Sequence, residues 1–165
     1  MARTQDDHLW ALAHAERAAL AEDLAGLGAE QWRHDTLCGE WDAEQILAHV
    51  ALGEASGAAA ALAIAAGQRA VYDNRPSLDE WNLPRMVRQA SGAGGMAGIV
   101  RRYGELLCDI AAGLTEPELE VALPVLIISK DQVLVDGPRP LRSLLAGFGE
   151  VHLPAHAEQL RGLRR

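Results

Sequence analysis

The fold of this chain is decided by a helix-forming stretch at residues 42–57, which reads DAEQILAHVALGEASG. Asp42 and Gln45 form a D-x-x-Q pattern related to the capping box, in which the aspartate oxygen accepts hydrogen bonds from first-turn amides. Apolar residues then recur at helical spacing to about Ala66. The stretch therefore predicts a long helix that begins beside Asp42.

One line of this predicted helix carries His49, Gly53 and Gly57, which are four residues apart and so lie one above the other. A glycine inside a helix costs about 1 kcal/mol relative to alanine. Two glycines on one line therefore indicate the close approach of another helix. We expect this line, and His49 with it, to face the interior.

Three further helices are expected around this one, and together they predict an all-α fold, a four-helix bundle. Their ranges are about Asp6 to Ala25, a stretch with Ile99 to Leu114 on one face that ends near Gly113, and a last helix from about Leu141. Neither an internal repeat nor a low-complexity linker interrupts them, so we expect a single domain over residues 1–165.

The segments between the helices differ in character. Residues 67–94 are irregular by composition, with a turn capped by Ser77 and Glu80 and a short helix from Pro84. Residues 123–135 alternate apolar runs with a polar turn and predict a short β-ribbon before the last helix. Gly137, Pro138 and Pro140 are expected to end this ribbon.

Composition narrows the class of function. The formal net charge is -8 at pH 7, which opposes binding to nucleic acid. Cys38 and Cys108 form no CxxC pair, so neither a disulfide framework nor a zinc knuckle is indicated. The N-terminus lacks a signal-peptide core, and the alanine-rich stretch Ala55–Ala66 is too short to span a bilayer. We expect a cytoplasmic protein with no nucleic-acid or membrane partner.

The pair His152 and His156 is the strongest chemical signal near the C-terminus. Two residues at i and i+4 stack on one helix face and can bind one ion together. They share a line with Leu145 and Phe148, which places them toward the interior, where an imidazole needs a hydrogen bond or a cation. A third imidazole, His49, would complete a three-nitrogen metal site with open coordination positions.

Pro154 lies between the two histidines and cannot donate to the carbonyl of Glu150. Two interpretations are open. The helix is kinked there, or a new helix begins at Pro154 and takes His152 off the face of His156. The apolar rhythm continues on both sides of the proline and favours a single kinked helix.

Other candidate residues have ordinary interpretations. His8, His14 and His34 lie among polar or alanine-rich residues and are not expected to be ligands. Glu150 and Glu158 could orient an imidazole from outside the site, although solvated carboxylates are the default. Three residues precede His49, namely Trp32, Cys38 and Trp41. We expect the two tryptophans to pack at the end of the bundle and Cys38 to be a small buried apolar residue, in preference to a reactive thiol near the metal.

Two stretches resemble a known family. Residues 37–50 contain Leu37-Cys38-Gly39-Glu40-Trp41-Asp42 followed by Leu47-Ala48-His49, and residues 152–160 read HLPAHAEQL. Both resemble the DinB/YfiT-like superfamily of metal-dependent enzymes, and the first resembles the metal-binding N-terminal domain of mycothiol-dependent maleylpyruvate isomerase. The resemblance implies a four-helix bundle, commonly a homodimer, with His49, His152 and His156 as metal ligands. The isomerase pattern places a glutamate where this chain has His152, so the exact reaction does not carry over.

The chemistry of the ligand set and the resemblance together predict a class of enzyme. Three neutral imidazoles leave the dipositive charge of Zn²⁺ or Ni²⁺ facing an open position, where a thiol would lose its proton near neutral pH. We therefore expect a metal-dependent S-transferase or isomerase that uses a thiol such as mycothiol on a small electrophilic substrate. Two alternatives stay open: a hydrolase that uses metal-bound hydroxide, and a non-catalytic stress protein that binds a metal or small ligand.

Overall fold

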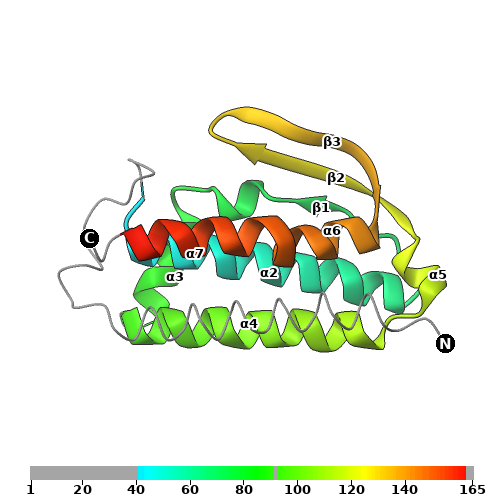
Figure 1. Cartoon of the computed structure of the whole chain (residues 1–165), viewed down its shortest axis with the longest axis horizontal. Helices are drawn as coiled ribbons and strands as arrows, with labels where there is room; N and C mark the ends of the chain where they lie inside the picture. Colours follow the sequence, from blue (N-terminus) through cyan, green and yellow to red (C-terminus); the bar gives the residue numbers. More distant parts are fainter. Residues whose placement is uncertain (1–40, 91–92, 163–165) are drawn as a thin grey trace.

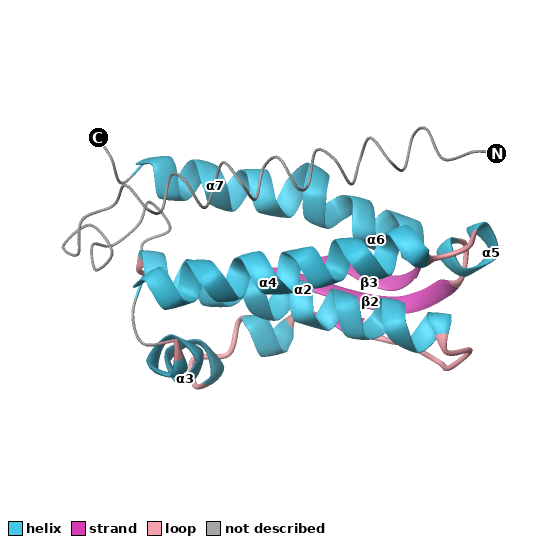
Figure 2. Cartoon of the chain, turned by 90° about the horizontal axis from the view of Figure 1, so that it is seen from below, coloured by secondary structure: helices cyan, strands magenta, loops and turns pink. Residues whose placement is uncertain are grey.

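The computed structural model describes residues 41–90 and 93–162. Three long helical segments lie alongside one another (Figures 1 and 2). They are α2 (Ala43–Ala65), α4 (Ala93–Gly113) and a last helix made of α6 (Leu141–Gly147), the π turn η3 (Phe148–His152) and α7 (Leu153–Gly162). The predicted first helix, from about Asp6 to Ala25, lies outside the described residues, so the four-helix bundle as a whole stays a prediction.

The capping box predicted for α2 is present. Oδ1 of Asp42 accepts from the backbone N–H of Gln45 at 2.8 Å, and Oε1 of Gln45 accepts from the backbone N–H of Asp42 at 3.0 Å. These two bonds satisfy amides that have no partner inside the helix. The start of α2, and hence the height of His49 along it, is therefore determined by a local sequence pattern.

α2 forms the centre of the core. Ile46, Leu47 and Val50 are fully buried, and Met96 and Val100 of α4 belong to the same apolar cluster. The apolar helix spans 23 residues and is longer than the alanine-rich stretch considered above. By length and composition α2 could cross a membrane, but 67% of its most apolar window is buried inside the fold, so its place in the core accounts for its composition.

The close approach predicted at the two glycines of α2 is confirmed. A Cβ atom on Gly57 would lie 2.6 Å from Cε2 of Phe148, and one on Gly53 would lie 3.6 Å from Cε1 of His152. The last helix therefore packs on the glycine line of α2. His49 is on the same line and is 5% exposed.

The last helix is continuous through Pro154, as the apolar rhythm favoured. Its irregularity is the π turn η3, where the backbone N–H of Leu153 bonds to the carbonyl of Phe148, five residues earlier. A widened turn immediately before a proline accommodates a residue that cannot donate to the carbonyl four positions back. The turn ends at His152 and leaves both His152 and His156 facing α2.

A three-stranded sheet lies on the side of α2 away from α4 (Figure 1). Its strands are β1 (Tyr72–Asp73), β2 (Ala122–Ser129) and β3 (Gln132–Pro140), in the order β1-β2-β3. β1 pairs with β2 in parallel, and β2 pairs with β3 as an antiparallel hairpin. Lys130 and Asp131 at its turn have positive φ values of 47° and 61°. The predicted ribbon is confirmed, and the described residues are mostly helical with this one small sheet, which is compatible with the predicted all-α class.

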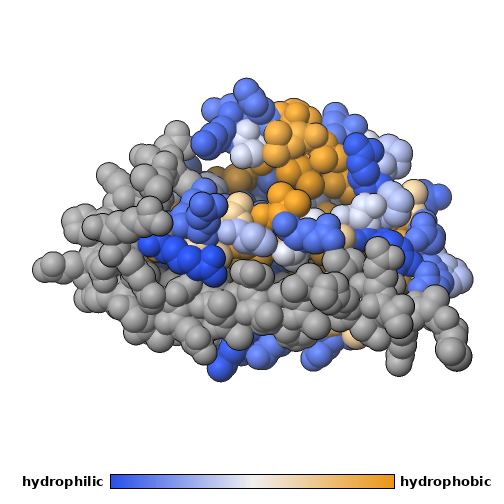
Figure 3. Space-filling model, viewed as in Figure 1, coloured by the Kyte–Doolittle hydropathy of each residue, from blue (hydrophilic) through white to orange (hydrophobic). Residues whose placement is uncertain are grey.

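The hairpin is longer than predicted. Gly137, Pro138 and Pro140 were expected to end it, yet all three belong to β3, where Pro138 lies opposite Pro124. β3 is at the edge of the described sheet, and an edge strand tolerates residues that donate no ladder hydrogen bond. Apolar side chains gather over the hairpin on the face that Figure 3 shows.

The segment predicted to be irregular, residues 67–94, contains more structure than its composition suggested. After β1 come the 3-10 turn η2 (Arg75–Ser77) and α3 (Asn82–Gln89). Oδ1 of Asp79 accepts from the backbone N–H groups of Trp81 and Asn82, both at 2.9 Å, so α3 begins before Pro84. A further short helix, α5 (Glu116–Leu119), precedes β2.

Candidate metal centre

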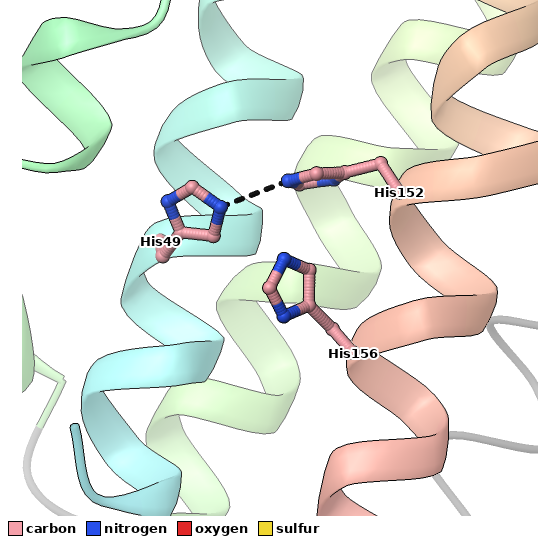
Figure 4. A group of neighbouring side chains, drawn as sticks. All are labelled: His49, His152 and His156. Atoms are coloured by element: carbon pink, nitrogen blue, oxygen red, sulfur yellow. Dashed lines mark hydrogen bonds between the residues drawn. The ribbon is translucent and has the colours of Figure 1, made fainter. Parts of the chain in front are cut away.

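Three imidazoles meet between α2 and the last helix. His49 comes from the second turn of α2, His152 ends the π turn, and His156 lies one turn further along α7 (Figure 4). Each residue offers one ring nitrogen to a common point, and these three nitrogens lie within 4.8 Å of one another. The Nε2 atoms of His49 and His152 are 2.9 Å apart. The structure thus brings together the three residues that the sequence singled out.

The ring of His49 is oriented by a backbone carbonyl. Its Nδ1 lies 2.8 Å from the carbonyl oxygen of Ser77. Because a carbonyl oxygen only accepts, Nδ1 carries the proton, and Nε2 presents its lone pair to the other two histidines. The tautomer of His49 is therefore fixed in the form that binds a metal through Nε2.

The Ser77 carbonyl is itself held from the sheet. The hydroxyl of Ser77 donates to the carbonyl of Asn74 at 2.7 Å. The side-chain amide of Asn74 exchanges two hydrogen bonds with the backbone of Ile128 in β2, at 2.8 and 2.9 Å. A chain of hydrogen bonds thus joins the hairpin to His49.

His156 has its own oxygen partner. Its Nδ1 lies 2.8 Å from Oε1 of Gln159, three residues further along α7. Donation to this oxygen places the proton on Nδ1, so the lone pair of Nε2 points toward His49 and His152 (Figure 4). Two of the three imidazoles are therefore held in the same tautomer by neutral oxygen acceptors.

Burial keeps all three rings uncharged near neutral pH. It lowers the pKa of His49 to about 4, helped by repulsion from His156 and opposed by the Ser77 hydrogen bond. Burial also lowers the pKa of His152 well below its usual value, with repulsion from His156 and then His49 adding to the effect. For His156 burial lowers the pKa and the Gln159 hydrogen bond opposes it. Neutral imidazoles are the form that binds a metal.

Apolar and aromatic groups surround the three rings. The rings of Trp41 and His49 have centroids 5.0 Å apart, and Phe148 lies edge-on to His152 at 5.8 Å. His49 is buried, and His152 and His156 are half-buried. Such surroundings limit access of water to the nitrogens and strengthen electrostatic interactions there.

The residues present fit a divalent cation. Zn²⁺ binds imidazole nitrogen at about 2.0–2.1 Å, so nitrogens that share one ion lie no more than about 4 Å apart. The 2.9 Å contact between His49 and His152 meets this limit. The set as a whole, which spans up to 4.8 Å, meets it after an inward movement of less than about 1 Å, and the lone pairs of His49 and His156 already point inward. The two nearby carboxylates, Glu150 and Glu158, are exposed and have no part in orienting the rings.

Sequence reasoning missed the oxygen partners. Gln159 belongs to the stretch that resembles the family, and its position three residues after His156 is a signal that the two side chains can meet on a helix. No local pattern pointed to Ser77 or Asn74. Five residues considered earlier lie outside the described residues, namely His8, His14, Trp32, His34 and Cys38.

The matching family model is described as the mycothiol maleylpyruvate isomerase N-terminal domain, and it matches residues 13–106. That range is more than half of the 165-residue chain and includes His49. The chain belongs to this family. The matched range ends before His152 and His156, so the convergence of all three histidines comes from the structure. No curated protein and no solved structure matches the chain.

Proposed function

We propose that this protein is a metal-dependent enzyme whose divalent ion, Zn²⁺ or Ni²⁺, is held by His49, His152 and His156. The observation that carries the proposal is the meeting of three buried or half-buried imidazoles, two of which are locked by Ser77 and Gln159 with their Nε2 lone pairs directed inward. Desolvating three imidazoles at one point costs free energy that apolar side chains would not cost. Their presence in the core is therefore explained by a bound ion better than by packing alone.

We assign the reaction to thiol-dependent transfer or isomerisation of a small electrophile, with mycothiol as the first candidate thiol. The family to which the chain belongs is described by a mycothiol-dependent isomerase, and this supports the choice of thiol. When bound, the ion supplies a dipositive charge that lowers the pKa of a thiol or water molecule beside it.

The residues of the chain supply the remaining requirements of such a site. Ser77 and Gln159 keep the proton of each imidazole on the far nitrogen, and Trp41 and Phe148 cover the rings with apolar surface. The pair His152 and His156 lies on the last helix, which packs closely on Gly53 and Gly57 of α2. The ligands are therefore preorganised, which reduces the reorganisation needed when substrate binds.

The proposal is tested by turnover of two substrate panels with zinc- or nickel-loaded protein. One panel combines mycothiol, or another low-molecular-weight thiol, with enones, alkyl halides and maleylpyruvate. The other contains activated esters and amides and no thiol. We expect turnover in the first panel that is abolished in His156→Ala. Turnover confined to the second panel would assign a hydrolase, and the absence of turnover in both, with metal bound, would contradict an enzymatic role.

A further inference from the structure

His152 differs from the other two imidazoles in lacking an outer partner. Its Nδ1 is enclosed and has no hydrogen-bond partner among the residues that the structure describes. Histidines that bind metals almost always donate their second ring N–H to an oxygen, and an enclosed polar atom without a partner costs free energy. Among the three histidines, His152 therefore lacks the outer hydrogen bond that His49 and His156 make.

A second polar group faces the same place. Tyr72 is 5% exposed, and within residues 41–90 and 93–162 its hydroxyl makes no hydrogen bond. The hydroxyl is not among the fully enclosed atoms, so it is able to bind water, as the polar end of a tyrosine commonly does. A Cβ atom on Gly53 would lie 3.6 Å from Cε1 of His152 and 3.8 Å from the Tyr72 hydroxyl. Cε1 is bonded to both ring nitrogens, and Nε2 faces His49. The His152 ring and the Tyr72 hydroxyl therefore both border the place beside Gly53, a residue that has no side chain.

A hydroxyl has the hydrogen-bonding capacity that this nitrogen requires. In the 2.9 Å contact between His49 and His152, His49 holds its proton on Nδ1, so His152 donates from Nε2 and presents a lone pair at Nδ1. When Nε2 of His152 binds an ion, the proton is on Nδ1 instead. A hydroxyl both donates and accepts, so it can serve the nitrogen in both states, whereas a carbonyl oxygen could serve only one.

We propose that Tyr72 is the positioning residue of His152, and that its hydroxyl holds Nδ1 through one water molecule beside Gly53. Because Nδ1 is enclosed, a small movement of the two rings apart admits this water. Polar groups separated by more than about 3.5 Å are commonly bridged in this way. β1 pairs Tyr72 with Val125, and the Tyr72 ring lies edge-on to Phe148 at 5.7 Å, so the hydroxyl has a fixed place. Residues 72–77 would then orient two ligands, His49 through Ser77 and His152 through Tyr72. The role rests on the proposed metal site.

The first test compares two variants that each remove one hydroxyl. Tyr72→Phe should weaken zinc affinity by about tenfold or more, the usual effect of losing an outer partner. Tyr103→Phe is the matched control, and it should bind zinc as the wild type does. Tyr103 packs against the cluster that contains Ile46 and Val50, whereas Tyr72 belongs to a separate apolar cluster with Phe148. Affinity is measured by competition with a chromophoric chelator, and circular dichroism confirms that both variants fold.

The second test uses Gly53→Ala, which adds a methyl group at ordinary contact distance from both His152 and Tyr72. It should fold, fill the place of the water and weaken zinc binding about as much as Tyr72→Phe. The double variant should be no weaker than either single variant, because both remove the same bridge.

The third test reads His152 directly, through the ¹⁵N resonances of its imidazole in the metal-free protein. The Nδ1 resonance should shift in Tyr72→Phe and stay in place in Tyr103→Phe. Unchanged His152 resonances would overturn the proposal even if zinc affinity fell, because a merely structural role would give that result. If the wild-type protein bound no zinc, the proposed function would fail, while these metal-free spectra would still decide the contact with Tyr72.

Discussion

Gly57 and Phe148 meet so closely that a Cβ atom on the glycine would lie 2.6 Å from Cε2 and 3.0 Å from Cζ of the ring. Phe148 begins the π turn, and its ring lies edge-on to His152. The glycine therefore sets the distance at which the π turn packs on α2. A methyl group added to Gly57 should therefore displace Phe148, and with it the neighbouring ring of His152.

Gly57→Ala should lower the free energy of unfolding by about 1–3 kcal/mol, the range expected when a packed core is overfilled, despite the better helix propensity of alanine. Gly98→Ala in α4 is the matched control, since its Cβ would meet no described atom within 4 Å, and it should leave stability equal or slightly higher. Urea unfolding measures both. Equal stability of the two variants would contradict the close packing.

Asn74→Ala should lower zinc affinity although Asn74 makes no hydrogen bond to the three histidines. It removes two hydrogen bonds to Ile128, and each buried group left without a partner costs about 1–3 kcal/mol. It also loosens the turn that presents the Ser77 carbonyl to His49, so zinc affinity should fall together with stability. Asn82→Ala, which removes an exposed hydrogen bond to the carbonyl of Pro76, should change neither by much. Unaltered zinc affinity in Asn74→Ala would show that the chain of hydrogen bonds does not act on His49.

Gln159 gives a test of the acceptor on His156. Gln159→Leu removes the oxygen that accepts from Nδ1 and should weaken zinc binding by about 10–100-fold. Gln159→Glu keeps an oxygen acceptor and should retain affinity. Chelator competition measures both variants, and similar affinities for Leu and Glu at this position would refute an orienting role.

The stability of the metal-free protein should depend on pH through its buried imidazoles. The folded-state pKa of His49 is about 4, below the ordinary value of 6.5, and those of His152 and His156 are also lowered. Between pH 6.5 and about pH 4, His49 is protonated in the unfolded chain and neutral in the folded one. The unfolded chain thus binds more protons, so the free energy of unfolding falls as the pH falls through this window. Above about pH 6.5 the full contribution of His49 is present.

Urea unfolding at several pH values in this window, with a chelator present, measures that slope. His49→Gln is the control, because it removes one of the titrating groups and leaves the carboxylates unchanged, so its slope should be shallower. The same slope in both proteins would contradict a neutral buried His49.

Local patterns in the sequence predicted much of this arrangement. The D-x-x-Q pattern gave the start of α2, and the glycine line gave the face that carries His49. The hydrogen-bond partner of His49 could not be predicted, because Ser77 acts through a backbone carbonyl. The place of that carbonyl depends on the contact between Asn74 and Ile128, which are 54 residues apart in the sequence. β1 has two residues, too few for a periodic pattern. Pro154 signalled an irregular helix without indicating a π turn.

The central claim, a metal held by three histidines, is tested most directly by elemental analysis of the purified protein. We predict close to one zinc or nickel ion per chain in the wild type, lost in His49→Ala and in His156→Ala and retained in His14→Ala. A folded wild-type protein that carries no metal, and takes up none at neutral pH, would contradict the account.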